Sequence, residues 1–169
     1  KKIAKSIIDL LSENTAKVVE IGPGMGVLTQ FLCKKEIDLK LVEIDKETIL
    51  YLRLRYPQLE KNMLEADFLK LNLQETFGNN FSLIGNFPYN ISSQILFAVF
   101  ENKDIIPEVV GMFQKEVAER VVARKGKKRG ILSVLLQAFY DIEYCFTVDE
   151  HVFQPPPKVK SGVIKLKRN

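Results

Sequence analysis

Apolar residues recur along the chain at two different spacings, which predict helices and strands in alternation. Near the start, Ala4, Ile7, Ile8 and Leu11 follow the spacing of one helix face, so an amphipathic helix is expected there. Short continuous apolar runs predict buried strands instead. The seven predicted strands are residues 17–21, 39–43, 62–65, 81–85, 109–113, 142–148 and 162–167.

Helical patterns separate most of these strands. Helices are predicted after the glycine-rich segment 22–26, from a cap at Asp45 to a stop at Pro57, at about 92–102 and 115–125, and from Gly130 to about Tyr140. Such alternation implies parallel strands joined by right-handed crossovers. The last two strands lack a helix between them and are expected to form an antiparallel pair. The predicted fold class is α/β, with a mostly parallel, doubly wound, seven-stranded sheet in one domain over 1–169.

Composition narrows the chemistry. The 169 residues are 46% hydrophobic and 27% charged, which is typical of a globular protein. The longest apolar runs, such as 131–136, are far shorter than the roughly 20 residues of a membrane span, and no signal-peptide pattern opens the chain, so a cytoplasmic location is expected. His151 is the one histidine, so no metal site is predicted. Cys33 and Cys145 lack the spacing of a zinc site or a disulfide framework, and we expect both to be buried.

A glycine-rich turn follows the first predicted strand. Ligands of open α/β sheets bind beyond the carboxyl ends of the strands, where Gly22, Gly24 and Gly26 lie. Glycine permits positive φ and lets a ligand approach the backbone. Glu43 ends the second strand, where a carboxylate accepts both hydroxyls of an adenosine ribose. This pairing predicts a cofactor that contains adenosine, although a glycine turn alone is often only a tight turn.

The glycine spacing indicates which cofactor. A dinucleotide fingerprint would place its third glycine at Val27 rather than Gly26, so a cofactor with a cationic amino-acid end and no pyrophosphate fits better. Glu20 is a candidate to orient that cation, and an ordinary capping or solvated carboxylate is an equal alternative. Asp67, after the third strand, is a candidate acceptor for the adenine amine. The neighbouring Ile44 and Phe68 complete the predicted cofactor site.

A second motif, Asn86-Phe87-Pro88-Tyr89, follows the fourth strand and should enter the same crevice. The Asn86 side chain and the carbonyl of Phe87 or Pro88 could accept both hydrogens of an adenine amine, a weak nucleophile that such contacts would activate. Tyr89 could stack on an extruded base, and Phe153 in a proline-rich loop is a second candidate. The alternatives are an ordinary Asn-x-Pro turn and a Phe153 that fills the core.

Basic residues are clustered, although the net charge is only +4. One group is Arg120, Arg124, Lys125, Lys127, Lys128 and Arg129, and a second is Lys158, Lys160, Lys165, Lys167 and Arg168. Clustered charge of one sign is typical of surfaces that meet phosphates. We predict that the first group contacts RNA phosphates, and the alternative is a merely solvated helix end.

Together these motifs resemble those of the ribosomal RNA adenine dimethyltransferases of the KsgA type. The matching segments, which span essentially the whole chain, are 20–29, 43–45, 86–92, 114–120 and 153–159. The resemblance implies a Rossmann-like class I methyltransferase fold and S-adenosylmethionine bound by Gly22, Glu43, Asp67 and Asn86. It also implies transfer of methyl groups to adenosines of small-subunit ribosomal RNA, a pre-30S particle as partner, and a monomer.

The chain departs from that family's pattern in three places. Phe87 stands where the family usually has leucine, a swap that should leave the carbonyl contacts intact. An N-terminal segment and a C-terminal helical domain of the family are absent, so we expect a fragment with reduced activity. The rivals are a macrolide-resistance methyltransferase of large-subunit RNA, a non-catalytic RNA-binding or transcription-accessory relative, and an NAD-dependent oxidoreductase. Leu28 and Thr29 after the glycine turn favour the small-subunit type.

Overall fold

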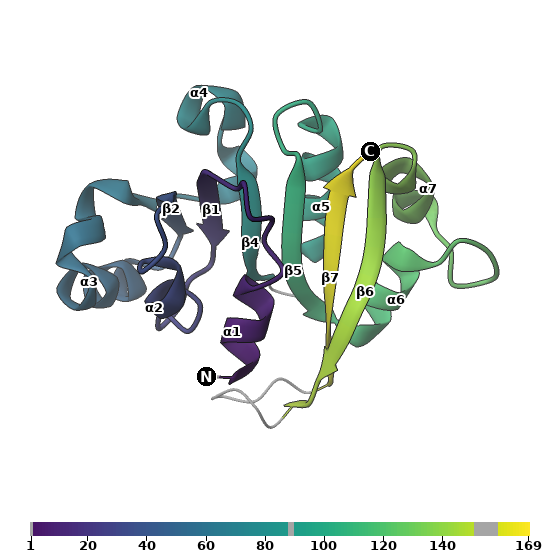
Figure 1. The fold of residues 1–169 in the computed structure, drawn as a ribbon, viewed down its shortest axis with the longest axis horizontal. Helices are drawn as coiled ribbons and strands as arrows, with labels where there is room; N and C mark the ends of the chain where they lie inside the picture. The colour runs from purple at the N-terminus through teal and green to yellow at the C-terminus, as the bar shows by residue number, and fades with distance from the viewer. Residues whose placement is uncertain (1, 88–89, 151–158) are drawn as a thin grey trace.

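Seven strands form one mixed sheet in the computed structural model, which describes residues 2–87, 90–150 and 159–169. The strand order is β3-β2-β1-β4-β5-β7-β6 (Figure 1). The strands are β1 Lys17–Ile21, β2 Asp38–Glu43, β3 Met63–Glu65, β4 Ser82–Asn86, β5 Glu108–Gln114, β6 Tyr140–Val148 and β7 Ser161–Arg168. The first five are parallel, and β7 runs antiparallel to both β5 and β6. The predicted fold class, including the antiparallel terminal pair, is confirmed.

Helices cover both faces of the sheet. They are α1 Lys2–Ile8, α2 Thr29–Leu32, α3 Lys46–Arg55, α4 Leu73–Phe77, α5 Ser92–Glu101, α6 Lys115–Val122 and α7 Ile131–Gln137. One core cluster packs under α1, α2 and α3, and the other under α4 to α7. Neighbouring residues of β5, Val109 and Val110, are fully buried on opposite faces. Burial on both faces explains the continuous apolar runs in the sequence.

The predicted starts and ends of the helices agree with the structure to different degrees. Asp45 caps α3, accepting hydrogen bonds from the Thr48 backbone N–H and hydroxyl at 3.1 and 2.5 Å. In contrast, the helix predicted after the glycine-rich segment is shorter than expected: α2 is a single turn that begins three residues after Gly26. The last predicted helix ends at Gln137, because Tyr140 is buried in β6 and its hydroxyl donates to the Ile106 carbonyl.

Three short helical segments between β2 and β4 were not predicted. They are the 3₁₀ helices η1 Pro57–Asn62 and η2 Phe68–Lys70, and the five-residue α4. Side-chain caps start two of them: Asp67 accepts from the Leu69 N–H and Asn72 from the Glu75 N–H. Segments of three to six residues show too little apolar periodicity to stand out in a sequence.

A buried carboxylate ties the loop after α1 to the sheet. Glu108, 4% exposed, accepts hydrogen bonds from Ser12, Thr15 and Ser82. The Lys165 ammonium lies 3.5 Å from it and donates to the Leu10 carbonyl. Arg168 likewise donates to backbone carbonyls of residues 103 and 104. Two of the basic residues near the end of the chain, Lys165 and Arg168, therefore make internal contacts.

Candidate functional site

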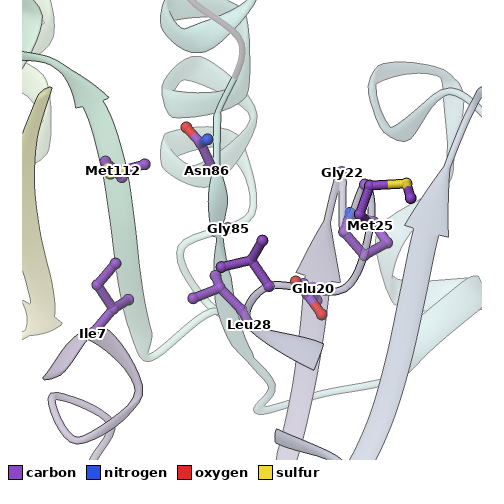
Figure 2. Close-up of a pocket in the computed structure, with 11 residues that line it drawn as sticks. Ile7, Glu20, Gly22, Met25, Leu28, Gly85, Asn86 and Met112 are labelled. Atoms are coloured by element: carbon purple, nitrogen blue, oxygen red, sulfur yellow. The ribbon is translucent and has the colours of Figure 1, made fainter. Parts of the chain in front are cut away.

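The carboxyl ends of β1 and β4 open onto one pocket of about 320 Å³. Figure 2 shows Glu20 and Gly22 on one side and Ile7 and Met112 on the other, with Leu28, Gly85 and Asn86 between them. The lining residues are Ile7, Glu20, Gly22, Pro23, Gly24, Met25, Val27, Leu28, Gly85, Asn86 and Met112. The glycine turn and the start of the Asn86 motif therefore share one cavity.

The backbone of the turn explains its three glycines. Gly22, Gly24 and Gly26 have φ values of 61°, 55° and 84°, in the left-handed region that side chains disfavour. A methyl group placed on Gly22 would lie 3.9 Å from the Asn86 carbonyl oxygen, so the two loops are neighbours. The Gly24 N–H donates to a carboxylate oxygen of Glu43 at 3.3 Å. The predicted cofactor turn and the predicted ribose acceptor are thus in direct contact.

Glu20 is a buried acid in the wall of this pocket. It is 1% exposed and accepts a hydrogen bond of 2.6 Å from the hydroxyl of Thr29, which is itself fully buried. Burial raises the pKa of the Glu20 carboxyl to about 8, the hydrogen bond from Thr29 opposes that rise, and the negative charge of Glu43 adds to it. A cation bound in the pocket would favour the ionised form.

Glu43 and Asp67 stand at the ends of the neighbouring strands β2 and β3, beyond the glycine turn. The Glu43 carboxylate accepts from the backbone N–H of Gly24 and of Asp45, and because a carboxylate has about four acceptor positions, capacity remains for hydroxyl groups. Asp67 uses one oxygen to cap η2. Ile44 is 66% exposed beside Glu43, whereas the Phe68 ring is in the core at 4% exposure, which leaves only the backbone of Phe68 for a ligand.

Asn86 ends β4 with its side chain exposed. The next residue turns inward: the Phe87 N–H donates to the Met112 carbonyl at 3.0 Å, and its ring lies 4.9 Å from that of Phe113, measured between centroids. Phe87 can therefore serve a substrate only through its backbone. Pro88, Tyr89 and Phe153, the other residues predicted to hold the base, lie outside the described residues.

The sequence did not predict the apolar residues that line this pocket, nor the tyrosine that packs behind the glycine turn. Ile7 of α1, Leu28 just before α2 and Met112 of β5 line the pocket, and their patterns signalled only burial. Tyr56 lies behind the glycine turn, where a methyl group on Gly26 would come 3.0 Å from its ring. No local signal marks Tyr56, because the contact joins segments far apart in the chain.

The predicted phosphate-contacting residues lie away from the pocket, on α6 and the loop that leads to α7. That loop projects beside β6, at the end of the sheet opposite α3 (Figure 1). All six basic side chains are exposed. Arg120 pairs with Glu116 at 3.0 Å and Lys128 with Glu119 at 3.5 Å.

Three expectations from composition concern metal, membrane and thiols. Within residues 2–87, 90–150 and 159–169, no group of three metal-ligating side chains comes together. None of the described helices has the length and apolar character of a membrane span. Cys33 and Cys145 are half-buried rather than buried, because both lie at the margin of a core cluster, packed against its edge.

Fold and site together define a class: this is the Rossmann-like fold of class I methyltransferases, as in solved structures of RNA methyltransferases. The family described as "Ribosomal RNA adenine dimethylase" matches residues 1–169. The chain belongs to that family.

Individual relatives agree with the family match. The chain is 59% identical over 173 residues to the ribosomal RNA small subunit methyltransferase A of Cytophaga hutchinsonii, covering 100% of this chain and 67% of that protein. A dimethyladenosine transferase from Plasmodium falciparum superposes with a TM-score of 0.84 at 30% identity, over 99% of this chain and 62% of that one. The 23S rRNA methyltransferase ErmE superposes with a TM-score of 0.85 at 28% identity, over 99% of this chain and 67% of that one. The chain spans about two thirds of the length of its curated relatives.

Proposed function

We propose that residues 1–169 are the methyltransferase domain of an enzyme that transfers methyl groups from S-adenosylmethionine to the N6 amine of adenosines in small-subunit ribosomal RNA, forming dimethyladenosine. The observation that carries the proposal is the contact between the two halves of the site. A methyl group on Gly22 would lie 3.9 Å from the Asn86 carbonyl oxygen, and both residues line one pocket. A methyl donor held by the turn would therefore lie beside an amine held at Asn86.

The charged groups and apolar walls of the site suit S-adenosylmethionine. Glu20 is a buried acid that gains from a cationic neighbour, which the ammonium of the methionine part would provide. Ile7, Leu28 and Met112 offer apolar walls to its hydrocarbon part. Glu43 would accept the ribose hydroxyls, and Asp67, with the backbone of Phe68, would meet the adenine. Ile44 would cover the ribose and adenine from the solvent side.

The chain's contribution to the reaction is positioning. When bound, S-adenosylmethionine supplies a methyl group on a good sulfonium leaving group, so no covalent protein nucleophile is needed. Asn86 and the carbonyl of Phe87 or Pro88 would accept the hydrogens of the adenine amine and direct its lone pair at the methyl group. Tyr89 and Phe153 would stack on the extruded base. Orientation of this kind contributes about 7–11 kcal/mol in well-aligned cases.

The exposed basic residues of α6 and the following loop, Arg120, Arg124, Lys125, Lys127, Lys128 and Arg129, would contact phosphates of the RNA around the target. The substrate we propose is a small-subunit precursor particle in the cytoplasm, bound by a monomer. The 59% identity to a small subunit methyltransferase A supports this assignment, whereas the superposition on ErmE keeps large-subunit RNA as the rival substrate.

Methyl transfer to each purified subunit tests the substrate. We expect labelled methyl groups in small-subunit RNA, and mass spectrometry should find dimethyladenosine there. Label confined to large-subunit RNA would support the macrolide-resistance type instead. Tight RNA binding without any transfer, unchanged by Asn86→Ala, would support a non-catalytic binding protein. Binding of NAD in place of S-adenosylhomocysteine would overturn the cofactor assignment.

Two variants separate cofactor binding from chemistry. Glu43→Ala removes the ribose acceptor, so the Kd for S-adenosylhomocysteine should rise about tenfold to a hundredfold. Asn86→Ala should lower kcat about a hundredfold at saturating cofactor, because the amine loses an orienting contact. Asn14→Ala, an exposed asparagine on the loop after α1, is the control and should change neither. A loss in Asn86→Ala that appeared only in cofactor affinity would contradict its proposed role.

A further inference from the structure

Two glycines lie side by side beneath the Phe87 ring. Gly85 of β4 and Gly111 of β5 are register partners in the sheet. A methyl group on Gly111 would overlap the Phe87 ring and come 2.8 Å from the Phe113 ring. A methyl group on Gly85 would lie 3.2 Å from the Phe87 ring, but only 2.6 Å from the carbonyl oxygen of Ile21 in β1. The flat surface of this glycine pair is what admits a phenylalanine at position 87.

The ring and the backbone of Phe87 hold the end of β4 in place together. The ring is 3% exposed and packs in the core cluster under α4 to α7, while its N–H donates to the Met112 carbonyl. Asn86, the preceding residue, lies on the other side, with its side chain exposed in the pocket. A shift of the ring would therefore move the Asn86 side chain and the Phe87 carbonyl.

We propose that Phe87 and Gly111 form a size-matched pair that positions Asn86 and the Phe87 carbonyl against the substrate amine, with Gly111 acting as a positioning residue. This inference rests on the proposed function. A displacement of about 1 Å at a reacting group costs on the order of a hundredfold in rate. A side chain at position 111 that pushes the ring outward should therefore lower turnover far more than it weakens cofactor binding.

A reciprocal rescue tests the pair. Gly111→Ala should lower kcat for methyl transfer to small-subunit RNA by about tenfold to a hundredfold, with the Kd for S-adenosylhomocysteine changed by less than about threefold. Phe87→Leu should lower kcat less than Gly111→Ala does. It leaves a gap above Gly111, which loosens the end of β4, but it does not push the end of the strand outward. In the double variant the smaller leucine makes room for the methyl group, so kcat should exceed that of both single variants.

Two control sets separate positioning from mere stability. Gly85→Ala should not be rescued by Phe87→Leu, because its closest neighbour is the Ile21 backbone oxygen and not the ring. Phe81→Leu makes the same substitution at a fully buried phenylalanine of the same core cluster, just before β4 at the far end of that strand. It should lower the melting temperature as Phe87→Leu does, yet leave kcat unchanged.

The outcomes are distinct. A double variant with kcat above both single variants supports the pair. A double variant no more active than Gly111→Ala, or a Phe81→Leu that loses as much kcat as Phe87→Leu, overturns it. If Gly111→Ala does not fold, the comparison of Phe87→Leu, the double variant and Phe81→Leu still decides. A wild-type protein that transfers no methyl to RNA would instead refute the proposed function.

Discussion

Glu20 is an ionisable residue that folding takes out of water. Burial raises the pKa of its carboxyl from 4.5 in the unfolded chain to about 8, and the charge of Glu43 adds to the rise although the Thr29 hydroxyl opposes it. The unfolded state therefore loses its proton before the folded state does. The free energy of unfolding of the ligand-free protein should fall as pH rises from about 4.5 to about 8, by up to about 1.4 kcal/mol per pH unit.

Denaturant unfolding at about pH 5 and about pH 8 measures this slope. Glu20→Gln cannot ionise and should flatten the profile, whereas Glu47→Gln, an exposed glutamate on α3, should leave it unchanged. A cationic ligand favours ionised Glu20, so S-adenosylhomocysteine binding should release a proton and tighten as pH rises toward 8. Equal slopes in the wild type and Glu20→Gln would show that another group carries the pH dependence.

Individual site residues could be predicted from sequence where strand ends mark them. Glu43 and Asn86 directly follow apolar runs, and parallel strands bring such positions to one edge of the sheet. The hydrogen bond from Thr29 to Glu20 and the packing of Tyr56 against Gly26 could not be predicted, because each joins side chains that only folding brings together. A role for the Phe87 carbonyl can be predicted from the motif, but the glycine pair beneath its ring appears only when β4 and β5 are paired.

At the scale of elements, the loop after α1 is attached to the sheet through the carboxylate of Glu108. Burial by itself would raise the pKa of Glu108, but hydrogen bonds from Ser12, Ser82 and Thr15 outweigh it and the net direction is down. Its contribution to stability is thus present above pH 4.5 and is lost as pH falls below that value. Glu108→Gln should lower the free energy of unfolding by about 2–3 kcal/mol, because it leaves buried donors without an ionised acceptor.

The neighbouring Glu13, exposed in the same loop, provides the matched control. Thermal or urea unfolding of Glu13→Gln should stay within about 0.5 kcal/mol of the wild type. Because α1 supplies Ile7 to the pocket wall, Glu108→Gln should also weaken S-adenosylhomocysteine binding modestly. A Glu108→Gln protein as stable as Glu13→Gln would mean that the network contributes little beyond what it costs to bury the charge.

The strands could be predicted closely from the sequence, whereas the short helical segments could not. All seven predicted strands lie within two residues of the observed ends, and most of them are apolar runs bounded by polar or turn residues. The sequence predicts no helix between β3 and β4, because η2 and α4 depend on single caps and on burial of Leu73 and Phe77. Such burial is a property of the assembled core.

At the scale of the whole molecule, strand order determines where the chemistry can happen. From β1 the chain adds β2 and β3 on one side, then crosses to add β4 and β5 on the other. The reversal between β1 and β4 is where ligands of open α/β sheets bind, and the pocket with Gly22 and Asn86 lies there. Alternation of strands and helices predicted a doubly wound sheet, but the order of its strands is set by long-range pairing.

The same layout separates the cofactor pocket from the basic loop beside β6, and this separation is testable. Lys125 and Lys127 are exposed in that loop, while Arg120 and Lys128 already pair with glutamates of α6. The double variant Lys125→Gln/Lys127→Gln should weaken RNA binding and reduce the slope of log K against log salt by about 1–2, since each phosphate contact contributes about 0.7–0.9. Binding of S-adenosylhomocysteine should not change.

Lys35→Gln/Lys61→Gln is the control. It removes the same charge from exposed positions near the β2–β3 end of the sheet, and it should leave the salt slope unchanged. Equal losses in both double variants would mean that RNA responds only to net charge, and that the loop is not a phosphate-contacting surface.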